Sequence, residues 1–520
     1  MSSKIAKGSA VILLGAFIFR IGGLIYRAVM ARLLDPVGYG ILGLTLPFQG
    51  FLIIIAGAGL PPAIAKHVSQ YYAIDDTEMV KAIINVSTKM MIVLGLIFSV
   101  VIFIFAEPLA IGLFHKPEAV LPFQLIALIT PFSVIVGAMR GTFQGFYQMT
   151  NILITRGFEL FFMIIVAVAL VLSGFYVAGA VIGTAVGFMM ALVSAVYLYR
   201  RDVWVLLNNP RKLLSRNTSK KFTFLEEMQI AKMLLFFSIP VVITGLAELL
   251  LYDMGTLVVG VYMPSQFVGY YTAASPVARL PLIISMAVAT SVLPATSEAM
   301  SLNDSQLLKT YILQSYRYVS LVVLPICVGT IVFATPIMTL INGSAYAPGS
   351  EALQILAVGM LFFTIYTISS SISQGLGKPT LPMMVLIGGT TIDLIFSVLL
   401  IPPFGINGAA VATTIASFFI MSVLAYKTLQ LARVSLPLGE FGKIAIASIL
   451  MGVIFIFFPK NYLSLFIAII LAPFIYGVIL AVIGGITMED IRIMHKLSTK
   501  LGPLSVIFDR IVSFLERFAV

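Results

Sequence analysis

Stretches of about 20 apolar residues recur along the entire length of this chain. A helix of that length crosses about 30 Å, the thickness of the hydrocarbon core of a bilayer. Only 10% of the 520 residues are charged, whereas a soluble domain carries about 25%. Because lipid offers the backbone no hydrogen-bond partners, only helices or closed barrels can cross it, and runs this long and apolar indicate helices. The sequence therefore predicts an all-α membrane protein.

Fourteen membrane-spanning segments are predicted. They lie at about 8–33, 40–65, 83–106, 120–147, 153–173, 177–199, 230–261, 267–297, 311–334, 351–376, 381–402, 405–427, 441–458 and 463–485. The apolar stretch near the N-terminus contains Arg20 and shows no clear small-residue cleavage site, so we interpret it as a retained helix and not as a signal peptide.

The second set of six segments reads like the first. Four landmark pairs occur in the same order, 229 to 233 residues apart: Gly38 and Gly269, Pro61 and Pro294, Gln144 and Gln374, Gly179 and Gly408. Such a fixed separation indicates an internal repeat. Because each copy contains an even number of segments, both copies enter the membrane from the same side, which makes the repeat parallel.

The predicted domains follow from this repeat. They are an N-terminal lobe at 1–199, a basic cytoplasmic linker at 200–229, a C-terminal lobe at 230–427, two further helices at 428–486 and an amphipathic tail at 487–520. The tail shows two apolar stripes at helical spacing with basic residues between them, which favours two short helices lying on the inner membrane surface. A tail that binds a partner protein is the alternative.

The formal net charge of +11 has a topological explanation. With the N-terminus in the cytoplasm, the inner loops carry nearly all the lysines and arginines, and the outer side keeps little beyond Arg32, Lys116 and Lys460. The sequence therefore predicts a multi-pass protein of the cytoplasmic membrane with both termini inside, and does not favour nucleic-acid binding. The single cysteine, Cys327, lies in an apolar run and excludes a disulfide framework.

Enzyme and metal signatures are weak. The three histidines lie far apart at His67, His115 and His495, and no phosphate-binding loop of the Walker type occurs. We therefore expect no catalytic residues, no metal site and no cofactor, apart from Na⁺ or H⁺ as a coupling ion.

Three of the arginines inside predicted spans are candidates to line a cavity, since an unpaired arginine at this depth costs about 3 kcal/mol. Arg20 and Arg27 are seven residues apart on nearly the same face of the first segment, with Gly23 between them, and Arg279 lies in the eighth. Such a stripe indicates a polar cavity, and guanidinium groups suit phosphates. A salt bridge between helices, or an Arg27 side chain that reaches the membrane surface, is the alternative.

Intramembrane carboxylates are also few. Glu248 and Asp253 lie in the seventh segment, the counterpart of the first, and are candidates for ion coupling or gating. Glu159 and Asp393 are single carboxylates for which pairing with a neighbouring helix is equally compatible with the sequence. Asp35 precedes Pro36 at the start of a segment, where capping of the helix explains it, although a role in gating stays open.

The two parallel lobes with two extra helices resemble the multidrug/oligosaccharidyl-lipid/polysaccharide (MOP) flippase superfamily. The details resemble its prokaryotic polysaccharide transporter branch, which includes sporulation stage V protein B, Wzx-type flippases and, more distantly, MurJ. The resemblance spans Lys7 to about Gly485 and is carried by Lys7-Gly8-Ser9, Arg20, Arg27, the run Ala31-Arg32-Leu33-Leu34-Asp35-Pro36-Val37-Gly38-Tyr39-Gly40, Gly59-Leu60-Pro61 and Met139-Arg140-Gly141-Thr142-Phe143-Gln144-Gly145.

This resemblance implies a flippase that moves a polyprenyl-(pyro)phosphate-linked oligosaccharide by alternating access. In MurJ-like proteins, arginines on helices one and eight line the cavity and an aspartate after helix one matters; Arg20, Arg27, Arg279 and Asp35 occupy matching places. A further basic residue on helix two of those proteins has no counterpart here before Lys66.

The implied partners are the lipid-linked sugar, membrane lipids and polysaccharide-assembly enzymes, and the implied state is a monomer. Two alternatives stay open. One is a cation-coupled multidrug antiporter of the same superfamily, although that group typically places a carboxylate on helix one and this chain has none there before Asp35. The other is a membrane-embedded glycosyl-transfer enzyme, which would need a catalytic acid or base at a membrane face.

Overall fold

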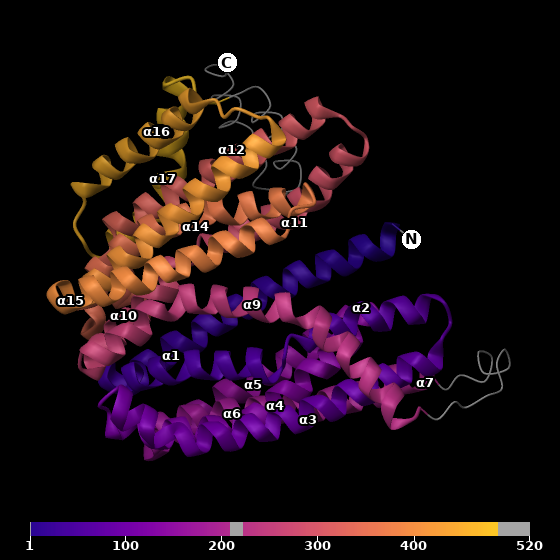
Figure 1. The fold of residues 1–520 in the computed structure, drawn as a ribbon. Helices are drawn as coiled ribbons and strands as arrows, with labels where there is room; N and C mark the ends of the chain where they lie inside the picture. The colour runs from indigo at the N-terminus through magenta and orange to yellow at the C-terminus, as the bar shows by residue number, and fades with distance from the viewer. Residues whose placement is uncertain (1, 208–221, 487–520) are drawn as a thin grey trace, which may run out of the picture. The chain divides into compact units, whose positions relative to one another are not determined.

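The computed structural model of the protein describes residues 2–207 and 222–486. All regular secondary structure within these residues is helical (Figure 1), which confirms the predicted all-α fold. The amphipathic tail predicted at 487–520 and the middle of the predicted linker lie outside the described residues.

Eleven helical segments of the described chain are long and apolar enough to cross a membrane. Three of them, Phe19–Ala73, Met149–Leu207 and Thr380–Ala432, each exceed 50 residues, more than twice the roughly 20 that one crossing needs. Each contains a point where the backbone leaves the helical conformation, at Asp35 (φ 57°), Gly174 (φ 93°) and Gly405 (φ 59°) respectively.

The contacts divide the protein into two compact units, Met1–Ala273 with Asp393–Ala409, and Ala274–Ile392 with Ala410–Val520. The α-helices that begin in the first unit are α1 (Ser2–Ala56), α2 (Leu60–Ala73), α3 (Thr77–Glu107), α4 (Val120–Gly145), α5 (Met149–Leu170), α6 (Tyr176–Leu198), α7 (Trp204–Leu207), α9 (Phe224–Tyr262) and α10 (Ser265–Ala278). Short π- and 3₁₀-helical segments join them at Pro108–Leu113, Pro117–Ala119, Val171–Phe175 and Tyr199–Val203.

The helices that begin in the second unit are α11 (Leu282–Ser301), α12 (Ser305–Val332), α13 (Ala334–Asn342), α14 (Ser350–Gly375), α15 (Thr380–Ala432), α16 (Leu438–Ile456) and α17 (Tyr462–Val482), with a 3₁₀ segment at Ser344–Gly349. The division places α9 and most of α10 with the first six predicted segments. It also interrupts α15, whose residues 393–409 belong to the first unit.

Local sequence explains where several helices begin. Side chains that accept hydrogen bonds from the first free backbone N–H groups stabilise a helix start. Asp76 does so for α3, Asp304 for α12 and Asn461 for α17. A reciprocal pair of Thr223 and Glu226 caps α9, so this helix already starts at Phe224, within the stretch predicted as linker.

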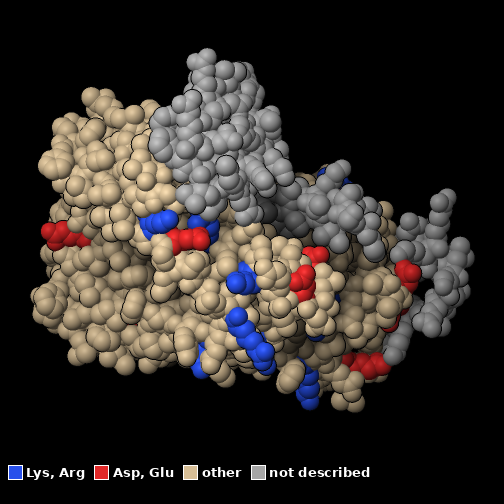
Figure 2. Space-filling model, turned by 90° about the horizontal axis from the view of Figure 1, so that it is seen from above, with Lys and Arg blue, Asp and Glu red and all other residues tan. Residues whose placement is uncertain are grey.

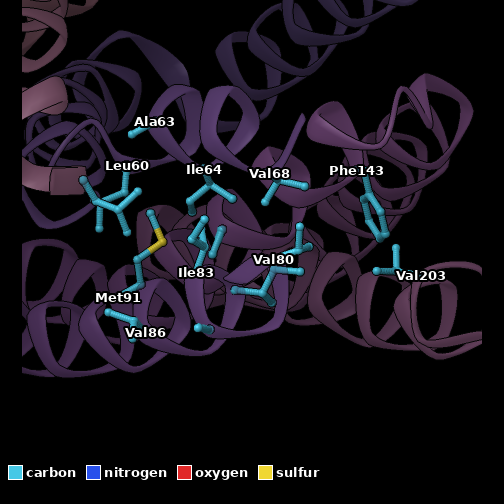
Figure 3. Close-up of a cluster of buried hydrophobic side chains, with 14 of the residues drawn as sticks. Leu60, Ala63, Ile64, Val68, Val80, Ile83, Val86, Met91, Phe143 and Val203 are labelled. Carbon is cyan, nitrogen blue, oxygen red and sulfur yellow. The ribbon is translucent and has the colours of Figure 1, made fainter. Parts of the chain in front are cut away.

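The core of the first unit consists of apolar side chains of α2, α3 and α4, together with residues of α7 and α9. Leu60, Ile64, Val80 and Phe143 are fully buried in this cluster (Figure 3). In contrast, α3 also exposes a row of large apolar side chains: Val93, Leu96, Ile97, Val100 and Ile104. A helix that is apolar on both its packed and its exposed faces matches a lipid environment.

Charged side chains are sparse on the surface as well. On the face shown in Figure 2, lysines, arginines and carboxylates form separate spots among uncharged residues. Apolar exposure of this extent is expected where lipid replaces water as the surrounding solvent. These features and the eleven spans confirm a multi-pass membrane protein.

The glycines that follow the landmark residues Gln144 and Gln374 each end a helix. Gly145 ends α4 and lies against the backbone carbonyl of Ala65 in α2. Gly375 ends α14 and lies against the backbone carbonyl of Leu293 in α11. A larger side chain at either position would displace the neighbouring helix. The two landmark prolines occupy different positions in their helices. Pro61 lies in the first turn of α2, whereas Pro294 lies inside α11.

Candidate functional site

The first part of α1 presents its two arginines differently. Arg20 is exposed, whereas Arg27 is half-buried. Arg20 lies 15 residues before the break at Asp35, about 22 Å along the helix. The space predicted beside Gly23 exists, because a side-chain carbon there would meet no atom within 4 Å. Arg20 therefore presents an exposed guanidinium far from the break that ends the first part of α1.

Arg27 is held by aromatic neighbours on the same chain segment. It lies within electrostatic range of the buried Tyr26 and interacts with the hydroxyl of the buried Tyr39. The Tyr26 hydroxyl lies 3.3 Å from the Ala180 carbonyl and 3.4 Å from the Thr184 hydroxyl of α6. These contacts tie the Arg27 region of α1 to α6 and leave Arg20 as the freer of the two cations.

The structure places Glu248 within electrostatic range of Arg20. The half-buried Glu248 carboxylate interacts with the Tyr252 hydroxyl one helical turn along α9 and with Arg20 on α1. Glu248 lies 15 residues before Met263, which follows α9, so it is also about 22 Å from the end of its helix. Asp253, five residues later, is half-buried as well.

Arg279 lies at a break and not inside a helix. The predicted eighth segment is two helices, and Arg279 follows α10 directly, before α11 starts at Leu282. It is half-buried and lies 14 residues after Ser265, about 21 Å along α10. Non-helical backbone at membrane depth is tolerated only where it is covered by protein or lines a polar cavity. Arg279 belongs to the second unit.

Asp35 caps the helix that follows it. Its Oδ1 accepts hydrogen bonds from the backbone N–H groups of Val37 at 2.8 Å and Gly38 at 3.0 Å. Its Oδ2 accepts a hydrogen bond of 2.9 Å from the hydroxyl of Tyr176 at the start of α6. The prediction that Asp35 caps a helix is confirmed. The hydrogen bond from Tyr176 was not predicted.

Lys116 is a buried cation of the first unit, with 5% of its surface exposed. Its ammonium donates hydrogen bonds to the carbonyls of Phe114, Gly260 and Met263. The last two belong to the end of α9, where carbonyl groups lack partners within the helix. Burial lowers the pKa of this ammonium, and the nearby Glu118 acts in the opposite direction. Lys116 therefore anchors the connection between α3 and α4 to the end of α9.

The other two intramembrane carboxylates have partners outside α1. Glu159 of α5 forms an ion pair of 2.5 Å with Arg140 of α4, whose guanidinium also donates to the Thr155 hydroxyl at 3.1 Å. Asp393 is fully buried, with Ser397 donating to it at 3.4 Å. The paired alternative holds for Glu159. Cys327 is buried and forms no disulfide, as predicted.

Sequence reasoning missed the partners that hold these groups. The sequence predicts no role for Tyr176 and places Lys116 only among the few basic residues of the outer side, since the partners of both residues are distant in the sequence. Within the described residues, no group of three His, Cys, Asp or Glu side chains is arranged to hold a metal ion. The first part of α1 offers one exposed guanidinium group, that of Arg20, and such a group suits an anion.

Comparison with protein families gives two matches. The family model described as "Polysaccharide biosynthesis protein" matches residues 5–300, which is more than half of the chain. The MatE model matches residues 240–399.

Two curated relatives come from Bacillus subtilis. The lipid II flippase MurJ is 24% identical over 451 residues, covering 82% of this chain and 82% of that protein. Stage V sporulation protein B is 24% identical over 456 residues, covering 84% of this chain and 85% of that protein. Among solved structures, lipid II flippase MurJ in an inward closed conformation superposes with a TM-score of 0.69 and 18% identity, covering 90% of this chain and 97% of that one. That similarity shows a shared fold.

Proposed function

Because the chain belongs to the polysaccharide biosynthesis protein family, within the MOP superfamily, we propose that it is a flippase for a polyprenyl-(pyro)phosphate-linked oligosaccharide. Its substrate would be a precursor of a cell-surface polysaccharide or of peptidoglycan, carried from the inner to the outer leaflet of the cytoplasmic membrane. MurJ is named a lipid II flippase, and this chain matches it over most of both lengths. These relatives make the protein a transporter and not an enzyme.

We further propose that the eleven apolar segments form fourteen spans. The three segments of more than 50 residues would each fold back at the breaks at Asp35, Gly174 and Gly405 and supply two crossings. The matching ends of α4 and α14 at Gly145 and Gly375 support two parallel copies of six spans. Both termini would then lie in the cytoplasm, as the lysine and arginine distribution predicts.

The single observation that carries the function is the exposed Arg20 deep in a membrane-spanning helix. Arg20 and Glu248, both in the first unit, each lie about 22 Å along their helices from the connection that follows. Arg20 and Arg27 of α1 would offer guanidinium groups to a pyrophosphate, and Arg279 of the second unit is a further candidate for binding the phosphates. Water-filled space is required, since a charged arginine facing lipid at this depth is costly.

Glu248 would act as the counter-ion of Arg20 in the absence of substrate. Binding of an anion would then free the carboxylate, which together with Asp253 is a candidate to take up Na⁺ or H⁺. Asp35 would contribute to gating through the break that it caps. The protein would work as a monomer in contact with membrane lipids and polysaccharide-assembly enzymes.

A second candidate is a cation-coupled multidrug antiporter, favoured by the MatE match at residues 240–399. The exposed cation on α1 opposes it, because a positive cavity repels cationic drugs.

The test is transport by the full chain in proteoliposomes. A fluorescent undecaprenyl-pyrophosphoryl disaccharide should move between leaflets, and a cationic dye should not be exported. Arg20→Ala should abolish the movement while the amount of folded protein is unchanged. Arg201→Ala is the matched control, because Arg201 is exposed and its ion pair is with the adjacent residue Asp202. Dye export without sugar movement would establish the antiporter instead, and full activity of Arg20→Ala would refute the assigned cavity.

A further inference from the structure

Asp35 and Tyr176 are among the non-glycine residues that adopt positive φ at helix connections of the first unit. Asp35 has φ 57° and ψ 174°, and Tyr176 has φ 49° and ψ −132°. Aspartate tolerates positive φ better than most residues, but for a bulky aromatic residue such a value is an outlier. Strain of this kind persists only where the surroundings enforce it, and it concentrates at functional positions.

The two strained residues contact each other. The Tyr176 hydroxyl donates a hydrogen bond of 2.9 Å to Asp35 Oδ2, while Asp35 Oδ1 caps the second part of α1. The contact requires a glycine at position 38, because a side-chain carbon there would come within 2.5 Å of the Tyr176 ring and hydroxyl. A glycine at 38 therefore leaves the room that the tyrosine occupies.

The first part of α1 is also fixed to α5 and α6 deeper in the membrane. Gly22 lies against Leu160 of α5, and Tyr26 contacts Ala180 and Thr184 of α6. With the contact at Asp35, the helix that carries Arg20 is attached to the same two helices at two levels.

We propose that Tyr176 is a positioning residue: its hydrogen bond to Asp35 fixes the break in α1 and thereby the direction of the helix that carries Arg20. Asp35 caps the following helix, and the tyrosine links that cap to α6. The transport consequence rests on the proposed flippase function, whereas the structural consequence is independent of it.

A distance measurement tests the structural consequence. Spin labels on Ile21→Cys and Leu172→Cys, both exposed sites, report the direction of the first part of α1 relative to the α5–α6 connection. The native Cys327 is 2% exposed and stays unlabelled. In the full chain, Tyr176→Phe should broaden the distance distribution. In an Asp35→Ala background the same substitution should add no further broadening, because the hydrogen bond is already absent.

Matched controls separate positioning from misfolding. Tyr176→Phe keeps the ring that Gly38 accommodates, so thermal unfolding should show a folded protein. Tyr426→Phe, which removes a hydroxyl from a side chain that is 64% exposed, should leave the distribution narrow. An unchanged distribution in Tyr176→Phe, or broadening that simply adds to that of Asp35→Ala, would overturn the proposal.

Transport supplies the second readout. In proteoliposomes with the fluorescent undecaprenyl-pyrophosphoryl disaccharide, Tyr176→Phe should lower turnover about fivefold, as expected for losing one hydrogen bond to a charged group, with KM nearly unchanged. Equal turnover of variant and wild type would contradict the transport consequence. If the wild type moves no disaccharide, the proposed function fails, while the distance measurement still decides the role of Tyr176.

Discussion

The break at Asp35 and the connection between α9 and α10 occupy corresponding places in the predicted repeat, but different chemistry holds them. Asp35 has a strained backbone and is bonded to Tyr176. At the other connection, Met263 has an extended backbone, and Gln266, the counterpart of Asp35, donates to its neighbour Tyr270. The repeat therefore preserves the path of the chain and not the polar groups at its turns.

The connection between α9 and α10 is held by residues of the first predicted copy. Lys116, from the connection between α3 and α4, bonds the carbonyls of Gly260 and Met263. Ser265 at the start of α10 donates to Glu118 at 3.1 Å. The first connection is thus fixed within copy one, whereas the second depends on a lysine that copy one supplies.

The largest expected effect comes from removing that lysine. Lys116→Met should lower the free energy of unfolding by about 3 kcal/mol, because buried carbonyls lose their donor. Thermal unfolding of the purified protein measures it. Lys460→Met is the matched control, since Lys460 is exposed, its hydrogen bond to the Phe455 carbonyl is long at 3.4 Å, and its ammonium lies 5.2 Å from the centre of the Phe333 ring. Equal losses in both variants would contradict the anchoring role of Lys116.

Substitution of the two corresponding glycines should have the next largest effect. A side-chain carbon on Gly269 would collide with the backbone carbonyl of Pro36, whereas one on Gly38 would meet the side chain of Tyr176. Backbone yields less than a side chain, so Gly269→Ala should cost about 2 kcal/mol and Gly38→Ala about half of that. Gly157→Ala, where no atom lies within 4 Å, is the control and should not destabilise. If Gly38→Ala destabilises the protein more than Gly269→Ala, the surroundings of Tyr176 are more rigid than the backbone at Pro36.

The smallest difference is expected between two substitutions of the cap itself. Asp35→Ala loses the cap and places alanine at positive φ, which should cost about 1–2 kcal/mol. Asp35→Gly loses the cap but adopts that φ freely, so its loss should be smaller. Gln266→Ala at the corresponding place should change the unfolding temperature little. If Asp35→Gly is as unstable as Asp35→Ala, backbone strain does not contribute to the difference.

The sequence predicted the membrane class, the all-α fold and the ends of α4 and α14 at Gly145 and Gly375, because apolar period and glycine position act locally. It did not predict that the chain breaks at Arg279, since Pro276 is accommodated inside α10 and the turn starts three residues later. The capping role of Asp35 followed from its place before Pro36. The contacts of Tyr176 with Asp35 and of Lys116 with α9 join residues more than 140 positions apart, which no local pattern encodes.

The central claim is that the arginine on α1, opposed by a carboxylate on α9, recognises the phosphate end of a lipid-linked sugar. Binding of undecaprenyl pyrophosphate to the purified full chain tests it most directly. The account predicts that Arg20→Gln weakens binding about thirtyfold, the effect of losing a charge-assisted contact, and that Glu248→Gln does not weaken it. Equal affinity of wild type and Arg20→Gln would contradict the account.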